Sequence, residues 1–183
     1  YCDTPLCHVE LPECRIERRA GGRDFARRVN PVTVDDIAAD LERLATDCPH
    51  HSVSLTGGEP LLHAETIRAL GPHLKRIGLL GYLETNGHLV DELERARPAL
   101  DLVGMDIKLE SATGVPARFD DNRAFLATCV REDLDVFAKI VVDATTRDEE
   151  IDGALAVVLD TAPKTPVVLQ PVTPFRGVGE PPS

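Results

Sequence analysis

The residues with the clearest chemical potential form the segment Thr56-Gly57-Gly58-Glu59, which follows a short apolar stretch. Two glycines directly after a strand would let a ligand approach backbone groups that a side chain otherwise shields. The carboxylate of Glu59 could then accept hydrogen bonds from a cationic amine. The same residues also fit an ordinary glycine turn before a helix that starts at a proline. No Gly-Lys-Ser/Thr follows, which excludes a phosphate-binding P-loop.

Three more apolar stretches later in the chain also end in polar residues. Glu84 opens the turn Glu84-Thr85-Asn86-Gly87, where its carboxylate could simply cap the next helix. Asp106 and Lys108 would share one strand face, because residues two apart point the same way, and such a pair is often a structural ion pair. Gln170 and the proline after it end the last apolar stretch, and by themselves these two residues indicate only a turn.

The first fourteen residues hold three of the five cysteines, Cys2, Cys7 and Cys14. Together with His8 they could form a small zinc site, although the spacing does not match the paired cysteines of structural zinc knuckles. Cys2 could instead bind an iron–sulfur cluster with ligands outside this sequence, or the three could be unconnected thiols. An odd number of cysteines does not suit a secreted disulfide scaffold, so reduced thiols are expected.

The elements that must position these residues alternate between helices and strands. Apolar residues at helical spacing predict five helices. Thr33 with Asp36 marks the start of the first helix, and a capping box of Thr146 with Glu149 marks the start of the last. The chain before Thr33 is rich in proline and glycine and is expected to be irregular. The expected helices cover 34–45, 67–77, 88–97, 122–131 and 146–159, and the expected strands cover 52–55, 79–83, 101–107, 136–142 and 166–169.

Strands that are apolar throughout and separated by amphipathic helices predict a parallel sheet covered by helices. A chain of 183 residues suits one domain, and five strands are too few for a complete eight-stranded barrel of about 250 residues. We therefore expect an α/β fold, either a partial TIM-type barrel or an open parallel sheet with flanking helices, in a single domain spanning residues 1–183. In both folds, ligands bind at the carboxyl ends of the strands, where these polar residues fall.

The composition narrows the classes of partner. A formal charge of -11 repels phosphate backbones, so a nucleic-acid partner is disfavoured. The basic stretch from Arg15 to Arg28 could make a local positive patch or a solvated loop. No window approaches the roughly 18 apolar residues of a spanning helix, and no secretory signal is visible, so we expect a cytoplasmic protein without a membrane partner.

Seven segments in this order resemble the radical S-adenosylmethionine superfamily and, within it, the 7-carboxy-7-deazaguanine synthase family. They are YCDTP, NPVT, VSLTGGEPLL, YLETNG, MDIKL, AKIVV and VVLQPVTP, and they span nearly the whole chain. The resemblance implies a [4Fe-4S] cluster held by three cysteine thiolates, which suit iron, with one iron left open. The resemblance assigns Cys2 to the third of these cysteines. It also implies that the family's first strand and its other two cluster cysteines precede Tyr1.

The remaining functional residues are also implied by the resemblance. Thr4 is assigned to a magnesium ion, which prefers oxygen ligands, and Thr56 to the substrate. The residues assigned to S-adenosylmethionine are Tyr1, Gly57, Gly58, Glu59, Glu84, Asp106, Ile107, Lys108, Gln170, Pro171, Val172 and Thr173.

The family converts 6-carboxy-5,6,7,8-tetrahydropterin to 7-carboxy-7-deazaguanine by hydrogen abstraction and ring contraction, a step towards queuosine and other 7-deazapurines. The resemblance therefore implies a small pterin substrate, an electron donor of the flavodoxin or ferredoxin type, and a homodimer.

Two alternative functions stay open. One is an activase that places a glycyl radical on a partner protein, although Thr4 and Gln170-Pro171 favour the deazaguanine family. The other is a non-catalytic structural or zinc-binding fragment that uses Cys2, Cys7, His8 and Cys14.

Overall fold

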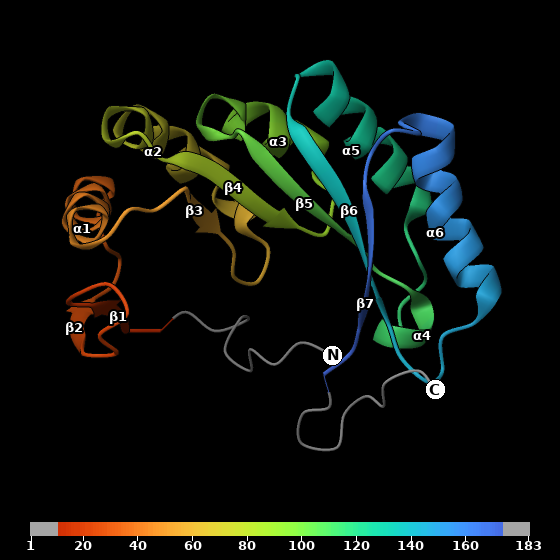
Figure 1. Cartoon of the computed structure of the whole chain (residues 1–183), viewed down its shortest axis with the longest axis horizontal. Coiled ribbons are helices and arrows are strands. Elements are labelled where there is room, and N and C mark those ends of the chain that lie inside the picture. The colour runs from red at the N-terminus through yellow and green to blue at the C-terminus, as the bar shows by residue number, and fades with distance from the viewer. Residues whose placement is uncertain (1–10, 174–183) are drawn as a thin grey trace.

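The computed structural model describes residues 11–173 and is built around a five-stranded, fully parallel sheet. The strands lie side by side in sequence order, β3-β4-β5-β6-β7, and the sheet curves (Figure 1). Each strand was predicted from the sequence to within two residues of its observed bounds, so the predicted parallel sheet is confirmed. The bounds are β3 Ser52–Leu55, β4 Leu80–Thr85, β5 Leu102–Ile107, β6 Asp135–Val142 and β7 Val167–Pro171.

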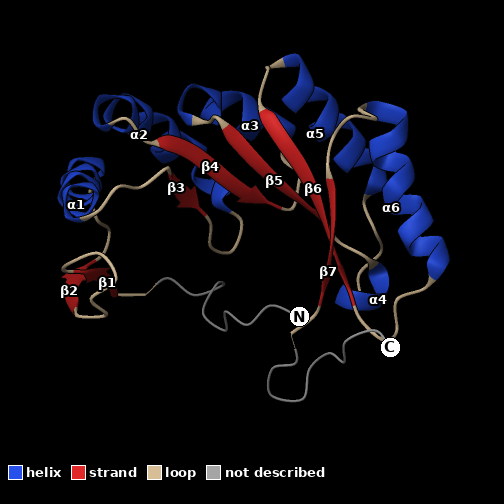
Figure 2. Cartoon of the chain, in the orientation of Figure 1, coloured by secondary structure: helices blue, strands red, loops and turns tan. Residues whose placement is uncertain are grey.

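The connecting helices α2, α3, α5 and α6 lie along one face of this sheet (Figure 2). The helices are α1 Val34–Asp47, α2 Ala64–Ile77, α3 Val90–Ala96, α4 Glu110–Thr113, α5 Phe119–Arg131 and α6 Asp148–Thr161, with short 3-10 turns η1 Pro60–His63 and η2 Arg97–Ala99. Thr33 caps α1 as predicted, because its hydroxyl oxygen accepts a hydrogen bond from the Asp36 amide at 3.1 Å. Within residues 11–173, no helix is both long and apolar enough to cross a bilayer.

The hydrophobic core lies between the sheet and these helices. Alternate residues of a strand point to opposite faces, so the central strands β4, β5 and β6 supply at least every second side chain to this core. Those of Leu83, Val103, Met105 and Ile140 are fully buried there and pack in one cluster with helix residues such as Phe125. Burial of each such side chain stabilises the fold by about 1.5–3 kcal/mol.

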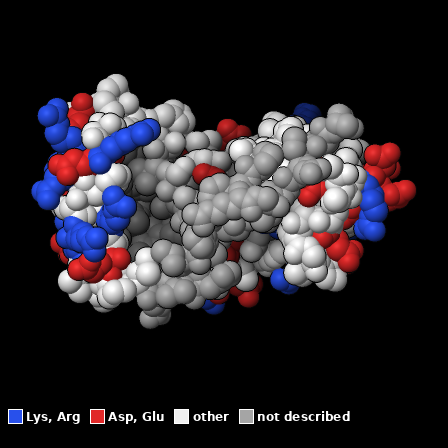
Figure 3. All heavy atoms as spheres, turned by 90° about the horizontal axis from the view of Figure 1, so that it is seen from below, with Lys and Arg blue, Asp and Glu red and all other residues white. Residues whose placement is uncertain are grey.

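A β-hairpin occupies the segment that was expected to be irregular. Strands β1 Glu13–Glu17 and β2 Phe25–Val29 pair in antiparallel register. The prediction was wrong because charged residues interrupt both strands and hide the alternation of apolar positions. The basic stretch therefore lies in the hairpin, where arginines pair with acids such as Glu13 with Arg27 at 3.1 Å. Figure 3 shows basic and acidic side chains mixed at the left end of the molecule, the end at which Figure 1 places the hairpin.

The start of α6 also differs from the predicted capping box. Only half of a capping box forms, one residue later: the Arg147 amide donates to the Glu150 carboxylate at 3.2 Å, but the arginine side chain has no acceptor for the return bond. The Thr146 hydroxyl instead accepts a hydrogen bond from the Asp143 amide at 2.9 Å. The predicted pair of Thr146 with Glu149 was therefore wrong, since a local turn after β6 uses the threonine.

Cys129 on α5 offers a test of the core. Its side chain is 0% exposed, and burial raises the pKa of its thiol to about 12, whereas Cys48 is exposed. Because the thiolate is the reactive species, iodoacetamide should alkylate Cys48 in the native protein and Cys129 only after unfolding in guanidinium chloride. Peptide mass spectrometry measures both sites. Alkylation of Cys129 at the rate of Cys48 in native buffer would contradict this packing.

Candidate functional site

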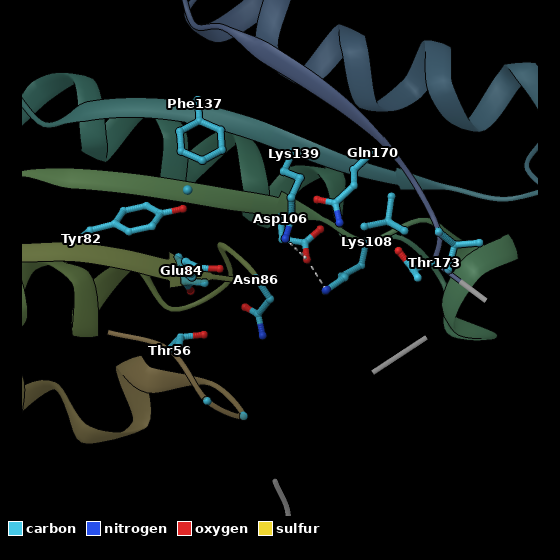
Figure 4. Close-up of a pocket in the computed structure, with 16 residues that line it drawn as sticks. Thr56, Tyr82, Glu84, Asn86, Asp106, Lys108, Phe137, Lys139, Gln170 and Thr173 are labelled. Atoms are coloured by element: carbon cyan, nitrogen blue, oxygen red, sulfur yellow. Dashed lines mark hydrogen bonds and ion pairs between the residues drawn. The ribbon is translucent and has the colours of Figure 1, made fainter. Parts of the chain in front are cut away.

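A pocket of about 460 Å³ opens at the carboxyl ends of the strands (Figure 4). This volume falls within the range of about 300–1,000 Å³ that is usual for small-molecule sites. The side of the sheet that faces away from the helices forms its wall. The lining residues are Thr56, Gly57, Gly58, Tyr82, Glu84, Thr85, Asn86, Gly104, Asp106, Lys108, Phe137, Lys139, Val141, Gln170, Val172 and Thr173.

Strand alternation explains why polar residues reach this pocket from an otherwise apolar sheet. On β5, Gly104 and Asp106 face the pocket, whereas Met105 and Ile107 belong to the core. On β6, Phe137 and Lys139 face the pocket in the same way. Since the strands are parallel and in register, the pocket-facing residues of neighbouring strands lie beside one another.

The structure brings most of the predicted site residues together in this pocket. Thr56, Gly57, Gly58, Glu84, Asp106, Lys108, Gln170, Val172 and Thr173 all line it. Three predicted residues do not line it: Glu59, Ile107 and Pro171. Tyr1, Cys2 and Thr4 lie outside the described residues, as do Cys7 and His8.

The carboxylate of Glu59 is engaged with the chain itself. It accepts hydrogen bonds from the Leu61 amide at 3.1 Å and the Thr85 hydroxyl at 2.8 Å. Its second oxygen accepts from the Asn86 amide at 3.0 Å. Glu59 therefore caps the turn η1 and ties the loop after β3 to the loop after β4. The sequence assigned this carboxylate to a cofactor amine, and the structure gives it a role in holding Asn86 at the pocket wall.

The loop after β4 is also held from α5. Asn122 is 0% exposed, and its side-chain amide donates to the carbonyl oxygens of Asn86 at 2.9 Å and Gly87 at 3.2 Å. Gly87 has a φ of 69°, and an added Cβ would lie 2.6 Å from the Met105 side chain. Sequence reasoning missed Asn122, although a polar residue on the buried face of a helix was a usable signal.

The backbone at Gly57 is open towards the pocket. Its φ of 142° lies in the region that favours glycine, and an added Cβ would meet no atom within 4 Å. Glycine is therefore required here by backbone conformation, and it leaves the peptide groups accessible to a ligand.

Charged groups of both signs lie across the pocket. The Asp106 side chain, only 13% exposed, forms ion pairs with Lys108 and with Lys139, the latter at 3.5 Å (Figure 4). Glu84 comes from the neighbouring strand and accepts a hydrogen bond from the Ser54 hydroxyl at 3.4 Å. A ligand with both an ammonium and a carboxylate group would find partners of opposite charge here.

Two titratable groups near the pocket have shifted pKa values. Burial, assisted by the charge of Glu84, raises the pKa of Tyr82, so its phenol stays protonated at neutral pH. Burial and the nearby guanidinium of Arg118 lower the pKa of His88, which favours the neutral imidazole.

The zinc interpretation gains no support from the described part of the chain. Among residues 11–173, no cluster of three or more His, Cys, Asp or Glu side chains could hold a metal ion. Of the four residues in that interpretation, only Cys14 is described, and it lies on β1.

Comparison with known proteins decides the family, although no family model matches the chain. The chain is 41% identical over 175 residues to the 7-carboxy-7-deazaguanine synthase of Geobacter sulfurreducens, which covers 94% of the chain and 68% of that protein. The chain belongs to this family. The synthase of Thermococcus kodakarensis is 31% identical over 158 residues, covering 83% of the chain and 60% of the relative. The family predicted from the sequence is thus confirmed, and the chain spans about two thirds of these relatives or less.

Solved structures share the fold. A structure described as native anSMEcpe with bound AdoMet superposes with a TM-score of 0.56 at 16% identity, covering 77% of this chain and 44% of that one. At this identity the likeness concerns the fold alone, and it agrees with the α/β fold expected from the sequence.

Removal of the Asn122 side chain tests the support of the β4 loop. Asn122→Ala would leave two buried carbonyl groups without their donor, so we expect a loss of about 1–3 kcal/mol in the free energy of unfolding. Guanidinium chloride titration measures this loss. Thr128→Val on the same helix is the control, because Thr128 donates only to the Ala124 carbonyl one turn away. Equal losses in the two variants would contradict a special role for Asn122.

Proposed function

We propose that the protein is a 7-carboxy-7-deazaguanine synthase, which converts 6-carboxy-5,6,7,8-tetrahydropterin to 7-carboxy-7-deazaguanine with S-adenosylmethionine. The product would serve the biosynthesis of queuosine and other 7-deazapurines. One observation carries the proposal: in a member of this family, the pocket at the strand ends collects Gly57, Gly58, Asp106 and Gln170, to which the resemblance assigns the cofactor.

The residues present suit this cofactor chemically. S-adenosylmethionine has an ammonium group, a carboxylate, ribose hydroxyls and an adenine ring. The pocket provides open backbone at Gly57, carboxylates from Glu84 and Asp106, and ammonium groups from Lys108 and Lys139. Its volume of about 460 Å³ is adequate for a ligand of this class.

In this proposal, the chain binds and orients the reacting molecules. The backbone of Gly57 and Gly58 holds the methionine end of the cofactor, and Glu84 meets its ribose. The segments 106–108 and 170–173 hold the remainder, while Thr56 contacts the substrate. Glu59 acts through the loop that it fixes. When bound beside a reduced cluster, S-adenosylmethionine supplies the power to abstract hydrogen, and the surrounding pocket excludes water from the reacting atoms.

Other parts of the proposal rest on the family resemblance. Cys2 is the proposed cluster ligand and Thr4 the proposed magnesium ligand, and both lie outside the described residues. An electron donor of the flavodoxin or ferredoxin type, a homodimer and a cytoplasmic location complete it. Both relatives named above are synthases, which disfavours the glycyl-radical activase.

Turnover tests the proposal directly. The protein expressed from its natural start, reconstituted anaerobically with iron and sulfide and then reduced, should form 7-carboxy-7-deazaguanine from the carboxy-tetrahydropterin and S-adenosylmethionine. Mass spectrometry coupled to liquid chromatography detects the product. If the protein carries an intact cluster but makes no product, the proposed function is wrong.

A lysine variant tests the placement of the cofactor. Lys108→Ala should weaken binding of S-adenosylmethionine about tenfold or more, because hydrogen bonds to charged groups contribute about 1.5–3 kcal/mol. Isothermal titration calorimetry measures this affinity. Lys164→Ala is the matched control, since Lys164 is exposed in the loop before β7 and does not line the pocket. Wild-type affinity in Lys108→Ala would remove this residue from the cofactor site.

A further inference from the structure

Two aromatic rings meet at the inner end of the pocket although their strands are not neighbours. Tyr82 lies on β4 and Phe137 on β6, with β5 between them. Adjacent strands are about 4.8 Å apart, so these two backbones are separated by about 9.6 Å. The ring centroids are nevertheless only 6.3 Å apart, with an angle of 27° between the planes. The rings therefore lean towards each other over β5.

Gly104 makes this approach possible. It lies on β5, paired with Glu84 on one side and with Phe137 on the other. An added Cβ would lie 2.8 Å from the Tyr82 hydroxyl oxygen and 2.9 Å from Phe137 Cζ. Unlike Gly57, Gly104 does not have a positive φ, so glycine is needed here for space.

The aromatic pair forms the floor of a pocket whose rim is polar. Gly104 and Phe137 precede Asp106 and Lys139 by two residues on their strands, which places them about 6.6 Å further in. Both rings are only half-buried and line the cavity, so part of their apolar surface faces the space where a ligand would lie (Figure 4). A flat apolar surface below charged groups suits a planar ring with polar substituents.

We propose that Tyr82 and Phe137, brought together over Gly104, form a binding surface for the planar ring of the substrate. The identity of that ring, the pyrimidinone half of a reduced pterin, rests on the proposed function. The segments assigned to S-adenosylmethionine all lie at the strand ends, which leaves the inner end to the substrate. The ring's polar substituents then face the layer of Asp106 and Lys139. Tyr82, which stays protonated, can donate a hydrogen bond to a ring carbonyl.

Tyrosine fluorescence gives a direct readout of this contact. The chain contains no tryptophan and two tyrosines, Tyr1 and Tyr82, so the difference in emission between the wild type and Tyr82→Phe isolates Tyr82. Titration of the protein, expressed from its natural start, with pterin-6-carboxylate should quench the Tyr82 emission to saturation. The same titration of Tyr82→Phe corrects for absorption by the pterin.

Phe137→Leu separates ring binding from simple packing, because leucine keeps an apolar side chain but removes the flat ring. We expect it to keep the thermal unfolding midpoint near that of the wild type, to raise the Kd for pterin-6-carboxylate about three- to tenfold, and to raise KM for the substrate in turnover by a similar factor. Gly104→Ala, which forces the rings apart, should weaken binding as well. Leu169→Ala is the control, since Leu169 is exposed and lies outside the pocket.

Two results would overturn the inference, and a third would support it while overturning the proposed function. If Phe137→Leu binds the pterin and turns over the substrate like the wild type, the rings only pack against the sheet, while the proposed function stands. If S-adenosylhomocysteine quenches Tyr82 and the pterin does not, the floor holds the adenine of the cofactor instead. If the wild type makes no product but the pterin quenches Tyr82 in the expected pattern, the reaction is wrong and the ring site remains.

Discussion

The hydrogen-bonded register between the parallel strands β3 to β7 fixes which side chains the pocket contains. Along β5 and β6 this register places Gly104 beside Phe137 and Asp106 beside Lys139. A slip of one residue would turn Met105 and Ile107 towards the pocket and bury Asp106 among the helices. The helices pack on the other face through fully buried apolar residues, so such a slip would also disrupt the hydrophobic core. The stability of the core and the arrangement of the pocket are therefore set by the same register.

The loops at the strand ends add a second level of order. Glu59 accepts three hydrogen bonds, from its own turn, from the last residue of β4 and from the loop after it, and Asn122 holds the same loop from α5. Buried polar groups that are paired in this way restrict a loop to one conformation. Asn86 is thus held at the pocket wall before any ligand arrives, and the backbone at Gly57 is left open. Such preorganisation lowers the entropy lost when a ligand binds.

Much of this arrangement follows from local patterns in the sequence. Apolar strands alternating with amphipathic helices predicted the parallel sheet, and polar residues at the ends of four of the five strands predicted where the pocket lies. The hairpin was missed because Arg15, Arg27 and Arg28 interrupt its short strands, and its pairing joins residues that no local pattern connects. The direction of the Glu59 carboxylate depends on Thr85, 26 residues later, which no reading of the local motif could supply.

The aromatic floor shows a different limit. The sequence Val136-Phe137-Ala138 is apolar on both faces of β6, so the alternation of residues does not reveal which face is open. Only the sheet order, which places Gly104 between Tyr82 and Phe137, shows that these rings meet. The family resemblance gave no assignment for these three residues, so their proposed role starts from the geometry of the rings.

The central claim is that the pocket at the strand ends holds S-adenosylmethionine beside an iron–sulfur cluster. Electron paramagnetic resonance of the protein expressed from its natural start, reconstituted, reduced and measured anaerobically before and after addition of S-adenosylmethionine, tests it most directly. The account predicts a reduced-cluster signal that changes when the cofactor is added. A protein that assembles no cluster, or a cluster whose signal is the same with and without the cofactor, would contradict the account.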